Sequence, residues 1–229
     1  MVQAAKVFIL PPLTPEDIAK RIKGFSKLKR ENLAGREIEV GSSILDLDLE
    51  DGRLVGTFEE NFLLSLKYKD EVLRAPLTVR TGFIFMRGER ATYLIVAARK
   101  NRANRIAGQL SSIISDEKGF IQEAWISSEE FRKLYEGRMG TVKVVFFGDV
   151  RIPNVRNLSL YGEELTSTSL YQEYLKLGRV WYVVFEPEDG LVIGLTRNCV
   201  VTFFSRVSLE EAMAFIEREI LPRVSISIE

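Results

Sequence analysis

The sequence predicts an α+β fold made of two pseudo-symmetric repeats, a curved antiparallel sheet with helices on one face. Two observations carry this prediction. The segment Thr14-Pro-Glu-Asp-Ile18 is echoed by Ser127-Ser-Glu-Glu-Phe131, and each echo opens a stretch patterned as helix, strands, helix. The strand patterns are joined mostly by short turns, which favours antiparallel pairing. We therefore expect a first α+β repeat over residues 4–115 and a second over residues 120–221.

The first repeat begins with an apolar strand that Pro11 and Pro12 stop. Thr14 then caps a helix, because Pro15 suits the first helical position and Asp17 favours the positive helix start. This helix is expected to fray into Lys27, Lys29 and Arg30. The remaining elements are expected as strands at 37–51, 61–68, 77–86 and 92–99 and a helix over 102–114.

A hairpin follows from the period-two run Leu45-Asp-Leu-Asp-Leu-Glu50 and the turn Asp51-Gly52. Its leucines are expected to face the core and its acids to face water. The pairing should set Glu50 against Arg53, Asp48 against Val55, Asp46 against Thr57 and Leu49 against Leu54.

The second repeat opens with an entry strand over 120–126, and Ser127 caps the next helix with Glu130 as its capping-box partner. Ser208 and Glu211 form the same box at the last helix. Residues 165–178 fit either a short helix or a loop followed by a strand. The strands are expected at 141–151, 156–161, 180–186, 191–196 and 199–205.

Composition excludes several kinds of chemistry. Lys plus Arg and Asp plus Glu both number 32, so no net charge draws the protein to nucleic acid or to an anionic membrane. The chain has no histidine, which removes imidazole catalysis, and the single Cys199 lies in an apolar strand pattern. We expect no cofactor, no membrane partner and a cytoplasmic location, and the many charged residues suit a thermophile.

The C-terminal part resembles the TATA-box-binding protein family. The likeness lies in the run from Glu186 to Thr202, followed by Ser208-Leu-Glu-Glu-Ala212, and in Phe120-Ile-Gln122, which is similar to that family's entry strand. The resemblance implies a saddle-like duplicated fold. It does not extend to the residues that contact DNA: Val96 and Leu195 stand about where the family has phenylalanine wedges, and Glu123 stands where it has asparagine.

Two sets of charged residues are candidate sites. Asp46, Asp48 and Glu50 share one strand face and could hold a magnesium ion for a carboxylate-dependent metal enzyme. A solvated hairpin face with Glu50–Arg53 pairing is the simpler explanation, because no lysine base or distant carboxylate is specified beside them. Basic residues are dense enough for phosphate contacts in two places. These residues are Arg99, Lys100, Arg102 and Arg105 before and within a helix, and Lys27, Lys29 and Arg30.

The sequence therefore predicts a non-catalytic binding or assembly module. Nucleic acid bound through the basic loops is the first partner to test. The alternatives are a protein–protein adaptor that uses an exposed sheet face, and the metal enzyme at the hairpin carboxylates.

Overall fold

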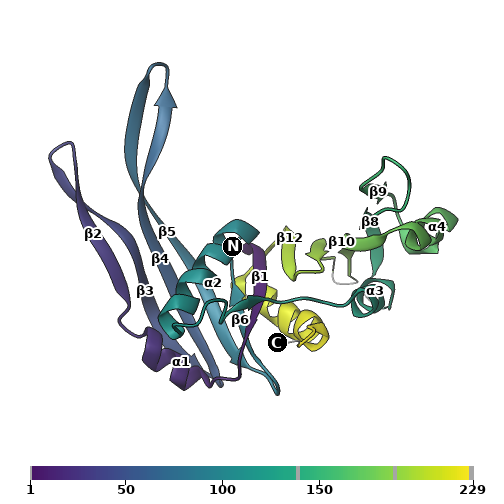
Figure 1. The fold of residues 1–229 in the computed structure, drawn as a ribbon, viewed down its shortest axis with the longest axis horizontal. Helices are drawn as coiled ribbons and strands as arrows, with labels where there is room; N and C mark the ends of the chain where they lie inside the picture. The colour runs from purple at the N-terminus through teal and green to yellow at the C-terminus, as the bar shows by residue number, and fades with distance from the viewer. Residues whose placement is uncertain (1, 138–139, 188–189, 227–229) are drawn as a thin grey trace. The chain divides into compact units, whose positions relative to one another are not determined.

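The computed structural model describes residues 2–137, 140–187 and 190–226 (Figure 1). It is a mixed α+β protein with antiparallel strand pairing, so the predicted fold class is confirmed. The chain divides into two compact units. We call residues 10–96 and 105–121 the hairpin unit, and residues 1–9, 97–104 and 122–229, which include both termini, the terminal unit.

The hairpin unit contains a five-stranded antiparallel sheet whose strands follow one another in sequence order. The helix α1 packs against β3, β4 and β5, and the later turns of α2 reach the same sheet. Arg21 of α1 donates to the carbonyl of Ile114 at 2.8 Å, so the two helices lie together. The elements are α1 (Pro15–Ile22), β2 (Ser26–Leu33), β3 (Arg36–Glu50), β4 (Arg53–Tyr68), β5 (Glu71–Arg87), β6 (Thr92–Val96) and α2 (Lys100–Ile114).

Local chemistry explains why α1 forms where it does. The Thr14 hydroxyl accepts a hydrogen bond from the backbone N–H of Asp17 at 3.1 Å, and Pro15 takes the first position, as predicted. Ile18 and Ile22 are fully buried on the sheet side. The helix ends at Ile22, and Gly24 follows with a φ of +75° that turns the chain into β2.

The terminal unit has a sheet in the order β1-β12-β11-β10-β8-β9, with the two-residue β7 paired to β1. One face of this sheet is buried under helices: Phe147 contacts Tyr171 and Tyr174 of α4, and Phe203 contacts Phe215 of α5. The elements are β1 (Val2–Leu10), β7 (Gln122–Glu123), α3 (Ser128–Gly137), β8 (Thr141–Gly148), β9 (Leu158–Tyr161), α4 (Ser169–Leu177), β10 (Arg179–Glu186), β11 (Ile193–Thr196), β12 (Val200–Val207) and α5 (Leu209–Phe215).

Several predicted details are wrong. Lys27, Lys29 and Arg30 lie in strand β2 and not at a fraying helix end. The expected entry strand over 120–126 is reduced to Gln122–Glu123. The ambiguous segment 165–178 is helical, with α4 between β9 and β10, whereas residues 26–96, all of them described, run from β2 to β6 without a helix. These elements do not show the pseudo-symmetric repeat.

The β3–β4 hairpin follows the prediction near its turn and departs from it further away. Glu50 pairs with Arg53, Leu49 with Leu54 and Asp48 with Val55, as expected. A bulge then intervenes, and Leu45 takes the place opposite Thr57 that was predicted for Asp46. Asp46 has a φ of 52°, which a short polar residue tolerates in a bulge. Leu49 is 46% exposed and is not a core residue.

Candidate functional site: the β4–β5 arm and the pocket at its base

The strands β4 and β5 form a long hairpin that extends past α2 and ends in a free turn (Figure 1). Their register is unbroken from the Arg53–Met86 pair to the Tyr68–Glu71 pair. We call the outer part of this hairpin, residues 61–78, the arm. It belongs entirely to the hairpin unit.

One face of the arm consists almost wholly of apolar side chains. Alternate residues of a strand share a face, and directly paired residues lie on the same side of the sheet. The register therefore places Leu64 beside Ala75 and Leu66 beside Leu73. We define the apolar arm face as Phe62, Leu64, Leu66, Tyr68, Leu73, Ala75 and Leu77.

This face is open to water. Leu66 is 49% exposed, Tyr68 59% and Leu73 50%, and Leu64 and Leu77 are exposed as well. Nearer the helices, the same face of β4 carries Phe58, which is fully buried. The apolar surface that makes the core of the hairpin unit thus continues along the arm into solvent.

The opposite face of the arm mixes polar and charged side chains with three apolar ones, Leu63, Val72 and Pro76. Arg80 pairs with Glu59 at 2.8 Å, and the Thr78 hydroxyl donates to Asn61 at 2.5 Å. Further out, Ser65 lies opposite Arg74, and Lys67 opposite Val72. The arm therefore has one almost wholly apolar face, suited to contact with another apolar surface, and one mixed face.

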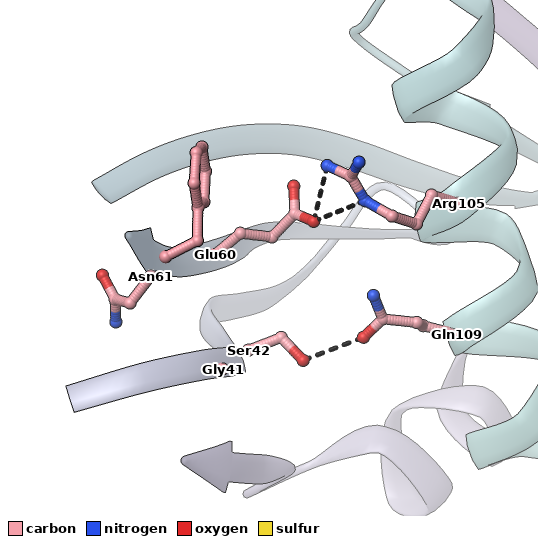
Figure 2. Close-up of a pocket in the computed structure, with 7 residues that line it drawn as sticks. Gly41, Ser42, Glu60, Asn61, Arg105 and Gln109 are labelled. Carbon is pink, nitrogen blue, oxygen red and sulfur yellow. Dashed lines mark hydrogen bonds and ion pairs between the residues drawn. The ribbon is translucent and has the colours of Figure 1, made fainter. Parts of the chain in front are cut away.

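A pocket of about 320 Å³ lies where the apolar arm face meets α2 (Figure 2). Glu60, only 6% exposed, accepts hydrogen bonds from the Nε and Nη2 atoms of Arg105 at 2.9 and 2.8 Å. Ser42 donates to Gln109 at 2.8 Å. Phe62, the first residue of the apolar arm face, lines the same pocket. The pocket can hold an aromatic ring against Phe62 and offer polar partners to a hydroxyl group.

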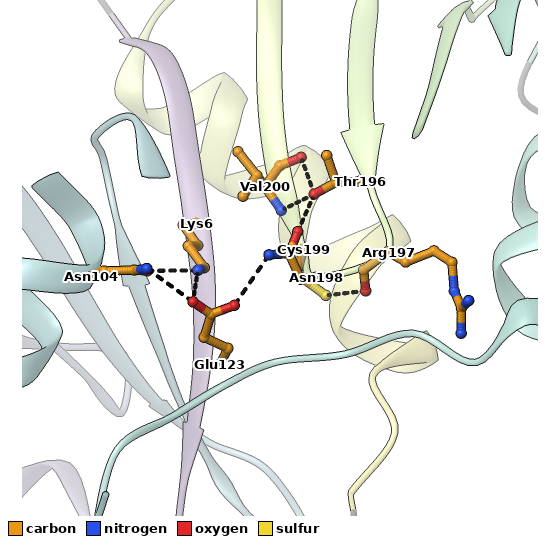
Figure 3. Close-up of polar contacts among 8 residues, drawn as sticks. All are labelled: Lys6, Asn104, Glu123, Thr196, Arg197, Asn198, Cys199 and Val200. Atoms are coloured by element: carbon orange, nitrogen blue, oxygen red, sulfur yellow. Dashed lines mark hydrogen bonds and ion pairs between the residues drawn. The ribbon is translucent and has the colours of Figure 1, made fainter. Parts of the chain in front are cut away.

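A polar cluster in the terminal unit holds a buried lysine (Figure 3). Lys6 is fully buried, and its Nζ lies 2.6 Å from Glu123 Oε1 and donates to Asn104 Oδ1 at 2.6 Å. Glu123 also accepts from Asn104 Nδ2 at 2.9 Å and from Asn198 Nδ2 at 3.1 Å. These bonds join β1, α2, β7 and the β11–β12 turn.

The two charged groups of this cluster have shifted pKa values. Burial lowers the pKa of Lys6, and the hydrogen bond and charge of Glu123 oppose that shift without cancelling it. Burial pushes the pKa of Glu123 upward, but its hydrogen bonds from Lys6 and Asn198 outweigh burial, so its pKa is lowered. The ion pair between Lys6 and Glu123 joins β1 to β7, which favours a structural role.

The predicted basic residues lie on strand β2 and around the start of α2. Lys27, Lys29 and Arg30 are exposed on β2, the edge strand of the hairpin unit, and Arg30 lies 3.6 Å from Glu37. Lysine on an edge strand also discourages unwanted strand pairing. At the start of α2, Arg99 and Lys100 are exposed and Arg102 is half-buried. Arg105 is directed to Glu60.

Two sets of predicted positions remain: the hairpin carboxylates, and the two residues that stand where the TATA-box-binding protein family has phenylalanine wedges. Asp46, Asp48 and Glu50 are exposed, and among the described residues no group of three or more carboxylate, cysteine or histidine side chains could hold a metal ion. Val96 and Leu195 are fully buried. Neither side chain is available to a surface ligand.

Comparison with known proteins adds no family: no protein-family model matches the chain, and no curated protein does. Among the described residues, no helix combines the length and the apolar character needed to span a bilayer. The likeness to the TATA-box-binding protein family stays a prediction.

Sequence reasoning missed the apolar arm face. Its signal was present in the alternating run from Phe62 to Tyr68, where each second residue is apolar. Leu63 lies on the opposite face and hides the alternation. Within this run of β4, only Ser65 and Lys67 are polar residues on that opposite face.

Proposed function

We propose that the protein is a non-catalytic assembly module that docks onto another protein through the apolar arm face. The observation that supports this best is the exposure of five large apolar side chains, Leu64, Leu66, Tyr68, Leu73 and Leu77, on one face of a single hairpin. Their fractional exposures correspond to a patch on the order of 500 Å², which is at the upper end for a monomer and typical of interaction sites.

The geometry of the arm supports docking over catalysis. Its two strands pair with each other along the whole arm, so its side chains are presented on a regular scaffold. The polar groups at its base, Glu60 and Arg105, are bonded to each other. This arrangement offers contact area and a polar anchor at one end, which together resemble the core and rim of a protein interface.

The test replaces Leu66 with Glu and compares it with Ser65→Glu, which adds the same charge at the neighbouring position on the opposite face. The wild type and the two variants are expressed in the native host, crosslinked in the cells and analysed by gel and mass spectrometry. We expect a stoichiometric crosslinked species for the wild type and for Ser65→Glu that Leu66→Glu loses. Equal crosslinking by all three proteins would contradict the proposal.

Nucleic-acid binding at the start of α2 is a second candidate, supported by the exposure of Arg99 and Lys100. Affinity for single- and double-stranded oligonucleotides would be measured at several salt concentrations. Replacing both residues with Ala should flatten the log–log salt dependence by about one unit for each phosphate that the protein no longer neutralises. An unchanged slope would remove these residues from any such site.

A further inference from the structure

We propose that the partner of the apolar arm face is a second copy of this chain, bound with the two arms face to face and antiparallel. This inference rests on the proposed docking function and specifies its partner. In this arrangement the turn of each arm lies over the base of the other, and a two-fold axis runs across the strands at the level of the Leu64–Ala75 pair.

The apolar arm face is symmetric about that level. On β5 the inward residues are Leu73, Ala75 and Leu77, so Ala75 has a leucine two residues away on either side. On β4, Leu64 lies between Phe62 and Leu66. A two-fold axis at this level therefore sets Leu73 over Leu77 and Leu66 over Phe62. Large apolar groups meet large apolar groups, and the small Ala75 lies at the centre, where the two sheets come closest.

The two ends of the apolar arm face complement each other. Tyr68 and Glu71 form the pair next to the turn, and the same axis places them over the level of Glu60 and Val79. That level is the pocket at the base, where Phe62 and Arg105 line a space of about 320 Å³. The Tyr68 ring of one copy can enter this pocket against Phe62, with its hydroxyl near Glu60 and Arg105. Glu71, the one acid on the face, then lies toward the exposed guanidinium of Arg105, whose charge complements its own.

The apolar arm face is large enough for a dimer interface. Two faces on the order of 500 Å² each give a total near 1,000 Å², which is about the minimum expected of a specific interface. Packed sheets lie about 10 Å apart with interdigitating side chains, so leucines from both copies would fill the space between the arms. The outer faces of the two arms, which carry Lys67 and Arg74, remain in water on both sides.

The first test is the mass of the purified full-length protein by light scattering and sedimentation equilibrium. We expect the wild type and Ser65→Glu to have twice the monomer mass of 26.1 kDa. Leu66→Glu would bury an unpaired charge in the interface and should weaken dimerisation at least about 30-fold. Leu66 is already 49% exposed, so the urea midpoint and circular dichroism of this variant, compared under monomeric conditions, should match those of Ser65→Glu.

The second test fixes the arrangement through engineered cysteines and a short thiol crosslinker. Ala75→Cys lies near the axis and should crosslink to itself. Leu73→Cys should crosslink efficiently only when mixed with Leu77→Cys, because the axis sets these positions against each other. The native Cys199 is fully buried, so the wild type serves as the uncrosslinked control.

Each outcome decides one point. A dimer with this crosslinking pattern supports the inference, whereas self-crosslinking by Leu73→Cys with none by Ala75→Cys overturns the antiparallel arrangement. A wild type that stays monomeric at high concentration overturns the second copy as partner. In that case a Leu66-dependent crosslink to a different protein in cells leaves the proposed docking function standing, and its absence removes both.

Discussion

Replacing Glu123 with Gln should destabilise the terminal unit more than replacing Lys6 with Met. The two side chains form one ion pair, but they differ in exposure: the Lys6 side chain is fully buried, whereas that of Glu123 is 42% exposed. Glu123→Gln leaves an ammonium group inside the protein without its counter-charge. Lys6→Met leaves a carboxylate that water can reach and that Asn104 and Asn198 still bond.

The size of the difference can be bounded. An isolated buried lysine can always release its proton, and doing so at pH 7 from an unfolded pKa near 10.4 costs at most about 5 kcal/mol. Breaking a buried pair by removing one partner typically costs ~3–5 kcal/mol, and the partial exposure of Glu123 reduces this. We expect about 2–4 kcal/mol for Glu123→Gln and about 0–1.5 kcal/mol for Lys6→Met, whose side chain is similar in length and apolar.

The stability of the Glu123→Gln variant should also depend on pH. The pKa of Lys6 is lowered in the folded protein by burial, and Glu123→Gln removes the interactions that oppose this shift. The unfolded chain of the variant then binds the Lys6 proton more strongly than the folded one does. Its stability therefore rises as the pH increases toward the unfolded pKa of lysine, and the penalty of the variant should be smaller at pH 9.5 than at pH 7.

The assay is urea unfolding followed by the fluorescence of Trp125 and Trp181, which both lie in the terminal unit. Glu129→Gln is the matched control, because it removes a carboxylate from an exposed ion pair with Lys133 in the same unit and should change stability little. The reasoning fails if Glu123→Gln is no more destabilising than Lys6→Met, or if its penalty is the same at both pH values.

Two further predictions follow from individual contacts. Arg105→Ala should lower the free energy of unfolding by about 1–2 kcal/mol, because it removes two hydrogen bonds to the buried Glu60. The control, Lys100→Ala, changes an exposed position and should leave the free energy of unfolding unchanged. Equal urea midpoints for the two variants would contradict this prediction. Burial raises the pKa of the Cys199 thiol to about 12, so a thiol reagent at pH 8 should label the protein only after unfolding, and rapid labelling of the native protein would show that the β11–β12 turn opens.

The elements that the sequence predicts well are those whose signals are local. Thr14 and Ser208 cap helices with their own side chains, and the box between Ser208 and Glu211 is formed by both expected bonds. The turn at Asp51-Gly52 likewise sets the Glu50–Arg53 register from a few residues. Each of these depends on groups at most three positions apart, so a short stretch of sequence contains the whole interaction.

Predictions fail where a distant segment decides the outcome. The sequence of residues 46–47 contains no mark of the bulge that moves Asp46 out of the position opposite Thr57, because the bulge reconciles the pairing near the turn with the pairing nearer the helices. Arg105, whose side chain is 56% exposed, was predicted as part of a basic cluster with no bond to Glu60 expected. Its carboxylate partner, Glu60, lies 45 residues earlier, and only the packing of α2 on β4 brings the two together.

The exposed apolar face of the arm could not be predicted for the same reason, because distant segments decide which surfaces are covered. Period two states which residues share a face of a strand, but it does not state whether anything covers that face. Phe58 and Leu66 have the same parity on β4, yet the first is fully buried and the second is 49% exposed. The difference arises because the hairpin is longer than the helices that pack on it. An apolar pattern that continues beyond its cover requires another surface, and the symmetry of this one about Ala75 points to a second copy of the same chain.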